Sequence, residues 1–371
     1  MKEVVVLGVG MHKFGRFPEK PVSQMGREAA FMALDDAGVD FKDVQAGFCS
    51  HVHQGMGTGL SVFGELGQNG APVTNVEVGC SAGTRATILA AEAISRGVYD
   101  MCLVVGVEKM AGGLVGLQGA EKSYNELMGI MLFPVSVALA ARRHMHLYGT
   151  TREQFAQVTV KAHKMARLNP YAHYQIPLTL EDVLNSRVIA DPISLYECSP
   201  NSDGASAVLL CSKERARRYT SKPVYLVDWQ CGTPVYTRGE PQLSEGATRQ
   251  LAQALYDSSG LGPEDFDLVQ LHDSFTPREV MLIEELGLCP EGGGGPFTMS
   301  GNTDLCGKIP VNTDGGLLSR GNPLGAVGGA MVAEIVWQLR GQAGQRQVRN
   351  AKVGLLQNSG YGGEDIMIMK V

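Results

Sequence analysis

The same local pattern occurs twice in the sequence, once in each half of the chain. A polar residue, Cys80 or Asn322, stands at the start of a helical run of small residues. A glycine, Gly97 or Gly341, ends that run before an apolar, strand-like segment. Such repetition predicts a duplicated architecture in which two similar halves face each other. The polar starts of the two helices would then converge on one site.

Short apolar runs alternate with helical segments through both halves. We expect strands at 4–7, 44–48, 101–105, 268–271 and 353–356, and helices at 25–37, 81–96, 277–286 and 323–339. Apolar strands that alternate with helices indicate an α/β fold whose strands are covered on both faces. Glycine makes up 47 of the 371 residues, well above ordinary usage of about 7%. It gathers at the ends of these runs, where the backbone turns tightly or approaches a ligand closely.

Composition changes between the two halves. From about 110 to 195, Met, His and Tyr become frequent and several prolines interrupt the pattern. Long insertions of this kind often cover a binding site. We therefore expect an N-terminal half at 1–109 and 196–225, a helical substrate-covering insertion at 110–195, and a C-terminal half at 226–371.

Charge and apolar run lengths exclude several classes of protein. The net charge of −6 offers no basic face for a nucleic acid. The longest uncharged apolar stretch, Leu127–Ala141, contains Pro134 and is shorter than the roughly 20 residues of a membrane span. The start of the chain reads as a strand rather than a signal peptide. The eight cysteines include no C-x-x-C pair, so we expect no disulfide framework, no metal site and a cytoplasmic location.

Cys80 is the first candidate catalytic residue. It lies directly before the expected helix at 81–96. A helix N-terminus carries partial positive charge and free N–H groups, which lower the pKa of a thiol and favour the nucleophilic thiolate. The alternative is that Cys80 is a small core residue, as most free cysteines are.

Three histidines lie in positions where they could act on a ligand. His272 follows an apolar strand, beside Asp273 and Ser274, and strand ends of this kind point into ligand crevices. There it could bind an oxyanion or transfer a proton, or it could be a structural loop histidine. His51 and His53 lie in a glycine-rich loop with no third metal ligand in sequence, which favours solvated side chains over a metal pair.

Asn358 belongs to a glycine-rich segment, 357–363, that follows the last expected strand. Successive glycines leave backbone N–H groups free to bind an anion or oxyanion. A tight turn without function is an equally good interpretation.

Seven segments spread over nearly the whole chain form a set that is typical of one protein family. The segments are Cys80-Ser-Ala-Gly, Asn169-Pro-Tyr, Ser199-Pro-Asn-Ser-Asp-Gly-Ala, His272-Asp-Ser-Phe, Leu288-Cys-Pro-Glu-Gly, 315–326 and Trp337-Gln-Leu-Arg-Gly. Together they resemble the thiolase superfamily, and within it the sterol-carrier-protein-type thiolases and the thiolase-like, lipid-transfer-type acetyl-CoA acetyltransferases. The resemblance implies duplicated halves in a five-layer α/β/α/β/α fold, chemistry on coenzyme A thioesters, and dimers or tetramers.

The resemblance assigns roles to four residues. Cys80 matches the acylated nucleophile of the family, and His272 matches the histidine of its H-D-x-F motif. Gly362 and Gly363 fall in the loop that forms the second oxyanion hole together with the Cys80 backbone N–H.

The chain departs from the family at three positions. Asn322 stands where the family has the histidine of G-H-P, and an amide cannot take a proton at neutral pH. Asn358 stands near the place of the second cysteine, the usual acid/base. Ser274 replaces the cysteine that the sterol-carrier type has in H-D-C-F. The nucleophile is therefore kept, while the proton-transfer set is altered.

These observations predict a thiolase that cleaves a bulky 3-oxoacyl-CoA through an acyl-cysteine at Cys80. His272 and Asn322 are the expected donors to the enolate oxygen. The missing acid/base would be His272, Tyr361, His51 or His53. Coenzyme A is a substrate, and no permanently bound cofactor is expected.

Two other functions stay open. The first is a retro-aldol lyase on a bulky β-hydroxyacyl-CoA, which needs an enolate-binding site and a base but no nucleophilic cysteine. Tyr361 is the base candidate there. The second is a non-catalytic acyl-CoA-binding subunit. The resemblance also implies a homodimer core and a separate zinc-ribbon/OB-fold partner protein, with no nucleic acid and no membrane as partners.

Overall fold

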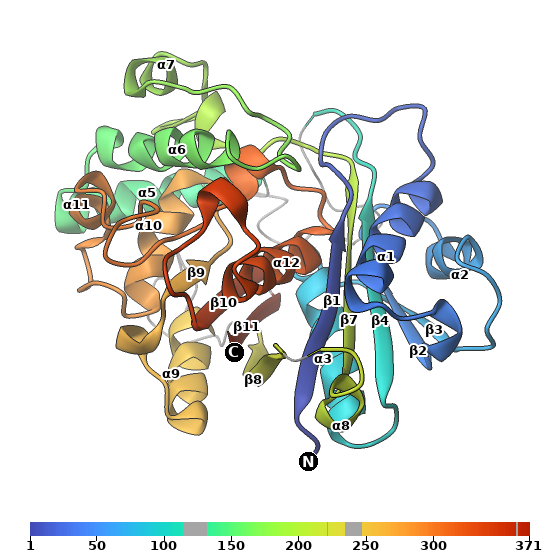
Figure 1. Ribbon diagram of the computed structural model, residues 1–371. Coiled ribbons are helices and arrows are strands. Elements are labelled where there is room, and N and C mark those ends of the chain that lie inside the picture. The colour runs from blue at the N-terminus through green and yellow to red at the C-terminus, as the bar shows by residue number, and fades with distance from the viewer. Residues whose placement is uncertain (114–131, 221, 234–246, 361–362) are drawn as a thin grey trace.

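The computed structural model describes residues 1–113, 132–220, 222–233, 247–360 and 363–371 (Figure 1). Its main sheet has the strand order β3-β2-β4-β7-β1-β8-β11-β10-β9. The strands are β1 (Val4–Met11), β2 (Ala46–Ser50), β3 (Val73–Val76), β4 (Met101–Glu108), β7 (Gly204–Ser212), β8 (Val224–Gly232), β9 (Leu268–Gln270), β10 (Val353–Gly360) and β11 (Gly363–Lys370), with β5 (Val188–Ala190) and β6 (Ile193–Ser194) as a separate pair. The helices are α1 (Val22–Ala37), α2 (Thr58–Gly64), α3 (Ala82–Ser95), α5 (Phe133–Tyr148), α6 (Arg152–Ala166), α7 (Leu180–Leu184), α8 (Lys213–Ala216), α9 (Ala247–Ser259), α10 (Thr276–Glu285), α11 (Gly294–Met299) and α12 (Val327–Arg340).

The two ends of the sheet repeat one pattern of strand directions. In the first half, β1 is antiparallel to β7, β7 is antiparallel to β4, and β4 is parallel to β2. In the second half, β8 is antiparallel to β11, β11 is antiparallel to β10, and β10 is parallel to β9. A short antiparallel pairing between β1 and β8 joins the halves. The predicted duplication is thus visible in the sheet, while the residue boundaries of the domains stay a prediction.

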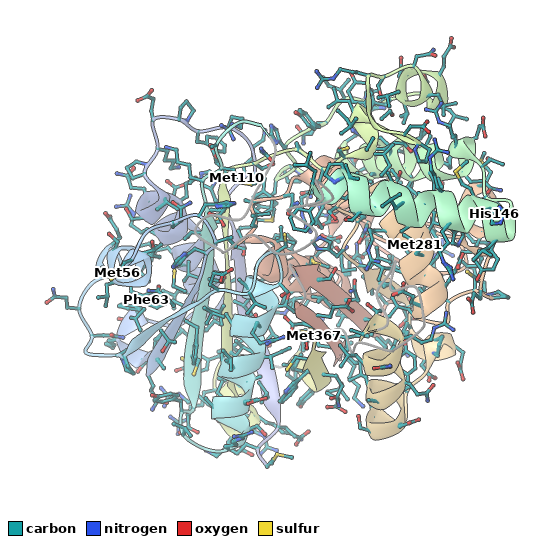
Figure 2. All side chains as sticks on the ribbon, turned by 180° about the vertical axis from the view of Figure 1, so that it is seen from behind. Met56, Phe63, Met110, His146, Met281 and Met367 are labelled. Carbon is teal, nitrogen blue, oxygen red and sulfur yellow. The ribbon has the colours of Figure 1, made fainter. Side chains whose placement is uncertain are left out.

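Alternating side chains of the strands separate an inner from an outer core. Val4 and Val6 of β1 pack inward in the cluster that includes α3 and α12, whereas Val5 packs outward with α1. Figure 2 labels one member of each cluster, Met367 of β11 in the inner one and Phe63 of α2 in the outer one. On the second half, α9 and α10 cover the outer face. The layers are helix, sheet, central helix pair, sheet and helix, as predicted.

The central helices α3 and α12 touch because glycine lines their contact. A Cβ atom on Gly83 would lie 3.1 Å from both Gly325 O and Gly328 N, and one on Gly328 would lie 2.1 Å from Thr84 N. Any larger residue at the second position would force the two helices apart. This contact brings the starts of both helices to one place, as the repeated sequence pattern predicts.

Most predicted elements are present, with several shifted boundaries and several additions. The helix expected from 323 begins at Val327, because a π-helical turn (Gly316–Arg320) precedes it and Asn322 pairs with Asn201 in an isolated β-bridge. It ends at Gly341, whose left-handed backbone suits glycine. Strands β3, β7, β8 and β11 and helix α9 were not anticipated.

The segment between the halves is largely helical where it is described. Helices α5 and α6 pack against α10 of the second half, with α7 next to α6 (Figure 1). Helix α6 begins at a capping box in which Thr151 accepts from Gln154 N. The apolar stretch at 127–141 lies partly outside the described residues. None of the described helices is long and apolar enough to cross a membrane.

Candidate active site

Most of the predicted site residues line one cavity of about 1740 Å³. Typical small-molecule sites measure about 300–1,000 Å³, so there is room for a bulky ligand. Tyr361 and Gly362 lie outside the described residues. His51 and Asn358 are not on the cavity wall. The predicted residues that do line it are His53, Cys80, His272, Ser274, Asn322 and Gly363.

Cys80 lies just before α3, on the cavity wall. Although part of its surface faces the cavity, burial among protein atoms raises the pKa of its thiol to about 12, and repulsion from Glu108 adds to the effect. The prediction that the helix start lowers this pKa is therefore wrong. The first N–H group of α3 is already used, since Ala82 N donates to Gly79 O at 3.0 Å. The resting residue is a neutral thiol.

Asn358 connects Cys80 to His272. Its Nδ2 donates to Cys80 O at 3.1 Å and to Thr84 Oγ1 at 2.7 Å. Its Oδ1 lies 2.7 Å from His272 Nδ1. Because the amide oxygen can only accept, His272 carries its proton on Nδ1, and Nε2 has a free lone pair. Asn358 thus selects the tautomer of His272 from behind the cavity wall.

His272 is neutral at physiological pH. Burial lowers its pKa to about 4, with smaller effects from Arg278 and Arg320 that the hydrogen bond to Asn358 opposes. A neutral imidazole with a bare Nε2 can accept a proton, and it becomes a hydrogen-bond donor at that atom only afterwards.

Asn322 is fixed by two serines. Its Nδ2 donates to Ser199 Oγ at 3.0 Å, and its backbone N donates to Ser202 Oγ at 3.3 Å. Its Oδ1 is buried and has no hydrogen-bond partner among the described residues. A half-turn of the amide would keep the bond to Ser199, because a hydroxyl can both donate and accept, and would make Nδ2 the free atom. In either orientation one amide atom therefore has no hydrogen-bond partner among the described residues.

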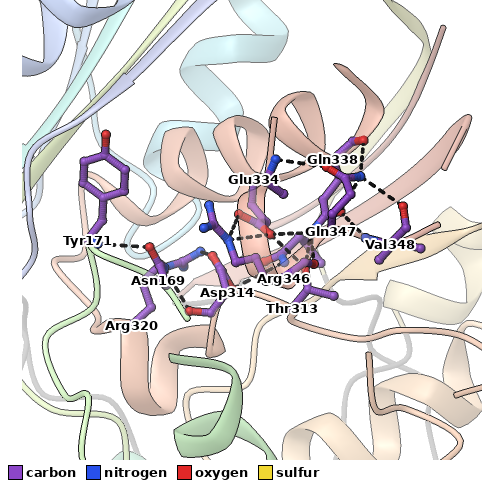
Figure 3. Close-up of polar contacts among 12 residues, drawn as sticks. Asn169, Tyr171, Thr313, Asp314, Arg320, Glu334, Gln338, Arg346, Gln347 and Val348 are labelled. Carbon is purple, nitrogen blue, oxygen red and sulfur yellow. Dashed lines mark hydrogen bonds and ion pairs between the residues drawn. The ribbon is translucent and has the colours of Figure 1, made fainter. Parts of the chain in front are cut away.

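A buried polar network supports the segment that carries Asn322 (Figure 3). Arg320 pairs with Asp314, and Asn169 Nδ2 donates to Asp314 O at 3.0 Å. Next to them, Arg346 pairs with Glu334 at 2.9 Å. Such fully buried pairs fix one arrangement of the backbone and are costly to break. The position of Asn322 is consequently rigid.

Glu108, at the end of β4, is a site residue that the sequence analysis missed. It is fully buried, and its carboxylate accepts from Val52 N at 2.9 Å, His53 N at 3.1 Å and Gly325 N at 3.0 Å. It fixes the loop after β2 and the approach to α12 at once. A charged residue closing an otherwise apolar strand was the signal that could have revealed it.

The two loop histidines differ from each other. His51 is buried, at 8% exposure, and neither ring nitrogen has a partner among the described residues. The expectation that it is solvated is wrong, because the close approach of Gly325 to its Cα covers it. His53 does line the cavity. Within the described residues, no cluster of three or more His, Cys, Asp or Glu side chains could bind a metal.

The insertion supplies an apolar wall opposite the catalytic candidates. Tyr174 stacks between His173 and His163, with ring centroids 4.3 and 6.2 Å away. His146, by contrast, lies at the outer end of α5, away from the cavity (Figure 2). The apolar and aromatic side chains of this wall include Leu132, Phe133, Val137, Tyr174, Ile176 and Tyr196.

Comparison with protein families matches two models to the chain. "Thiolase, N-terminal domain" matches residues 4–214, and "Thiolase C-terminal domain-like" matches residues 235–369. Together the two models cover nearly the whole sequence.

Individual relatives agree with these matches. The chain is 38% identical to an acetyl-CoA acetyltransferase of Methanothermobacter thermautotrophicus, over 97% of each chain. It is 36% identical to sterol carrier protein 2 of Oryctolagus cuniculus, over 100% of this chain and 72% of the relative. Among solved structures, the Ltp2-ChsH2(DUF35) aldolase superposes with a TM-score of 0.88 at 29% identity, covering 100% of this chain and 98% of that one.

Proposed function

The chain belongs to the thiolase family, and from that premise we propose that it cleaves a bulky 3-oxoacyl-CoA with coenzyme A in a degradative pathway. The observation that carries the proposal is the link through Asn358, which ties the Cys80 backbone and the His272 ring together beside one cavity. A nucleophile and a base held by one buried side chain are what covalent acyl transfer requires. The size of the cavity supports a large acyl group.

In this mechanism His272 Nε2 takes the thiol proton as Cys80 attacks the 3-keto carbon. The thiol is neutral at rest, so proton transfer and attack occur together rather than from a stored thiolate. The C2–C3 bond then breaks and an enolate of the smaller CoA ester leaves. Coenzyme A attacks the acyl-cysteine in the second half of the cycle, and Cys80 recovers its proton from His272.

Two groups of donors stabilise the charged oxygens. Protonated His272 donates to the enolate oxygen from Nε2, and Asn322 donates to it from Nδ2 when its amide is turned so that Oδ1 accepts from Ser199 Oγ. The backbone N–H of Cys80 serves the acyl oxygen, with Gly360 packed against it. A Cβ atom on Gly360 would lie only 2.3 Å from Cys80 N, so glycine there allows this approach. Preorganised donors of this kind each contribute about 10²–10³ in rate.

A retro-aldol lyase on a bulky β-hydroxyacyl-CoA is the second candidate. The neutral thiol of Cys80 and the replacement of the usual histidine by Asn322 favour it, because this reaction needs no nucleophile. The similarity to a solved aldolase over the whole chain supports it as well. His272 Nε2 or Tyr361 would then take the proton of the β-hydroxyl.

We also propose a homodimer core and a separate zinc-ribbon/OB-fold partner protein. The partner proposal draws support from the solved Ltp2-ChsH2(DUF35) aldolase, whose title names a second component. A cytoplasmic location fits the eight unpaired cysteines. Full activity of the purified chain without a second protein would contradict the partner proposal.

One experiment separates the two reactions. A panel of 3-oxoacyl-CoA and 3-hydroxyacyl-CoA esters with small and bulky acyl groups is incubated with and without free coenzyme A, and products are identified by mass. Thiolysis requires free coenzyme A and yields two CoA esters. Retro-aldol cleavage proceeds without it and yields an aldehyde or ketone. Trapping of an acyl group on Cys80 by peptide mapping confirms the first and rejects the second.

A further inference from the structure

We propose that Glu364 is the group that exchanges protons with C2 of the substrate, the task left open by the absence of a second catalytic cysteine. The proposal deepens the proposed function and rests on it for the thiolysis steps. Glu364 is the second residue of β11 and lines the same cavity as Cys80 and His272.

The pairing of β10 with β11 brings the backbone of Glu364 close to that of the catalytic candidates. Glu364 pairs with Ser359, and the adjacent residue, Gly360, packs its backbone against Cys80 N. Directly opposed residues of an antiparallel pair have Cα atoms about 4.5–5.5 Å apart. The side chain of Glu364 extends from the α9 side of β11, toward Thr248, and lines the cavity from there.

Glu364 has an unused oxygen at the cavity. The side chain is only 5% exposed, and among the described residues one hydrogen bond to it is recorded, from Thr248 Oγ1 to Oε2. A buried carboxyl with a single partner is unusual. The second oxygen, Oε1, is left for a ligand.

A chain of hydrogen bonds links this carboxyl to His272. The hydroxyl of Thr248, which donates to Glu364, accepts from Gln357 Nε2 at 3.3 Å. The Oε1 atom of Gln357 in turn accepts from His272 N at 3.3 Å. Two cavity groups that move protons are thus positioned by one buried network.

The surroundings allow Glu364 to exist in both protonation states. Burial raises its pKa above the usual value, while the hydrogen bond from Thr248 and the positive charge of Arg278 on α10 act in the opposite direction. Gly232 of β8, its other strand neighbour, has no side chain. Asp365, the next acid along the strand, is paired with Arg85 at 2.6 Å. Arg278 is accordingly the charged group that α10 turns toward this carboxyl.

The proton balance of the cycle closes with Glu364 included. When the C2–C3 bond breaks, the protonated carboxyl gives its proton to C2 of the leaving enolate and becomes a carboxylate. In the second half, the carboxylate takes the thiol proton of incoming coenzyme A, whose sulfur attacks the acyl-cysteine. His272 meanwhile accepts the Cys80 proton in the first half of the cycle and returns it to Cys80 in the second. Each group ends in the state in which it began.

Hydrogen exchange at C2 of acetyl-CoA in D₂O tests the role of Glu364 separately from the nucleophile. The carboxylate removes a C2 proton, the enolate is held in the cavity, and deuterium returns from the exchanged carboxyl. We expect Cys306→Ala, which changes an exposed cysteine that does not line the cavity, to keep this exchange at the wild-type rate. Glu364→Gln, which has the same shape, should lose about 10²-fold or more, the usual contribution of a general base. Mass spectrometry of recovered acetyl-CoA measures both.

The pH dependence adds a second test. Exchange needs the carboxylate, so it declines as the pH falls through the pKa of Glu364. Thr248→Val removes the hydrogen bond that lowers this pKa, and the midpoint should move to higher pH. Thr248→Ser keeps the hydroxyl and should restore the wild-type profile. These variants also decide the question if Glu364→Gln does not fold.

The outcomes separate the two proposals. Wild-type exchange in Glu364→Gln, or an unchanged midpoint in Thr248→Val, overturns the role of Glu364 whatever the main reaction is. Absence of an acyl adduct on Cys80 during turnover overturns thiolysis, and leaves the exchange result standing.

Discussion

Strands β4 and β10 occupy equivalent places in the two halves of the sheet, and each carries a buried polar residue near its end that reaches the other half. Glu108 on β4 accepts from Val52 N and His53 N, in the loop after β2, and reaches across to Gly325 N at 3.0 Å. Each half therefore sends a polar side chain to the helix start of the other half.

Asn358 on β10 does the same in the opposite direction, with different chemistry. It accepts from His272 Nδ1 and donates across to Cys80 O and Thr84 Oγ1. The Glu108 carboxylate is an acceptor only. Its charge raises the pKa of Cys80, although burial has the larger effect on that pKa. The amide of Asn358 both accepts and donates without charge. The duplicated scaffold thus fixes one loop with a charge and sets a histidine tautomer with an amide.

Cys80→Ala should have the largest effect on this arrangement. Thiolysis should fall by several orders of magnitude, because the covalent intermediate that divides the reaction into two easier steps is lost. The measurement is kcat/KM for release of coenzyme A esters. Substrate binding, followed by calorimetry, is the control and should change little. An active alanine variant would reject thiolysis in favour of retro-aldol cleavage.

Asn358→Leu removes the amide that joins His272 to the start of α3. His272 Nδ1, Cys80 O and Thr84 lose their partner, so the tautomer of His272 is no longer selected. We expect kcat to drop about 10²–10⁴-fold and the free energy of unfolding to fall, since each unsatisfied buried group costs about 1–3 kcal/mol. Urea unfolding and steady-state kinetics measure the two effects.

Asn358→Asp makes β10 resemble β4 and sharpens the same test. The carboxylate introduced by this substitution still accepts from His272 Nδ1, but its negative charge also stabilises the protonated form of the His272 ring. In the wild-type protein, the pKa of about 4 keeps His272 a neutral base until the pH falls to that value. The variant raises this pKa, so the acid limb of the kcat profile should move to higher pH. An unmoved limb would mean that another group is the base.

Much of the scaffold could be predicted from the sequence, because its signals are local. Gly38 and Gly341 terminate helices in the left-handed conformation, and both helix ends were anticipated. The start of α12 was placed too early, because Asn322 is held in an isolated β-bridge with Asn201 of the other half. Contacts between distant residues such as these have no local sequence signature.

At the site, too, some features could be predicted from the sequence and others could not. The positions of Cys80, His272 and Asn322 on one cavity follow from their places beside helices and strands. The pKa of Cys80 does not, because burial and the charge of Glu108 outweigh the helix start. Glu108 and Glu364 were missed because their burial depends on how distant segments pack around the strands that carry them.

Asn322→Ala addresses the other helix start and should have a smaller effect than loss of the tautomer. Removing one preorganised group facing the enolate oxygen costs about 10²–10³ in kcat. KM and the pH optimum should change little, because an amide does not titrate. Ser199→Ala, which removes the hydroxyl bonded to this amide but leaves the amide itself, is the control and should lose less. Equal kcat in wild type and Asn322→Ala would remove Asn322 from the enolate site.

The smallest effect is expected from a substitution of Glu108. This substitution tests directly how the negative charge at the end of β4 affects Cys80. With a pKa of about 12, Cys80 should react slowly with iodoacetamide at pH 8, after the exposed Cys231 and Cys306. Glu108→Gln removes the repulsion that adds to burial, so the pKa of Cys80 should fall and its alkylation should accelerate, as peptide mapping over a pH series would measure.

The variant should nevertheless turn over more slowly, because an amide nitrogen now faces backbone donors from the loop after β2. A thiol that becomes more reactive in an enzyme that becomes slower would show that the carboxylate serves to position the loop and α12. If Cys80 instead reacts faster than Cys231 in the wild-type protein, the resting residue is a thiolate and the charge at β4 has a different role.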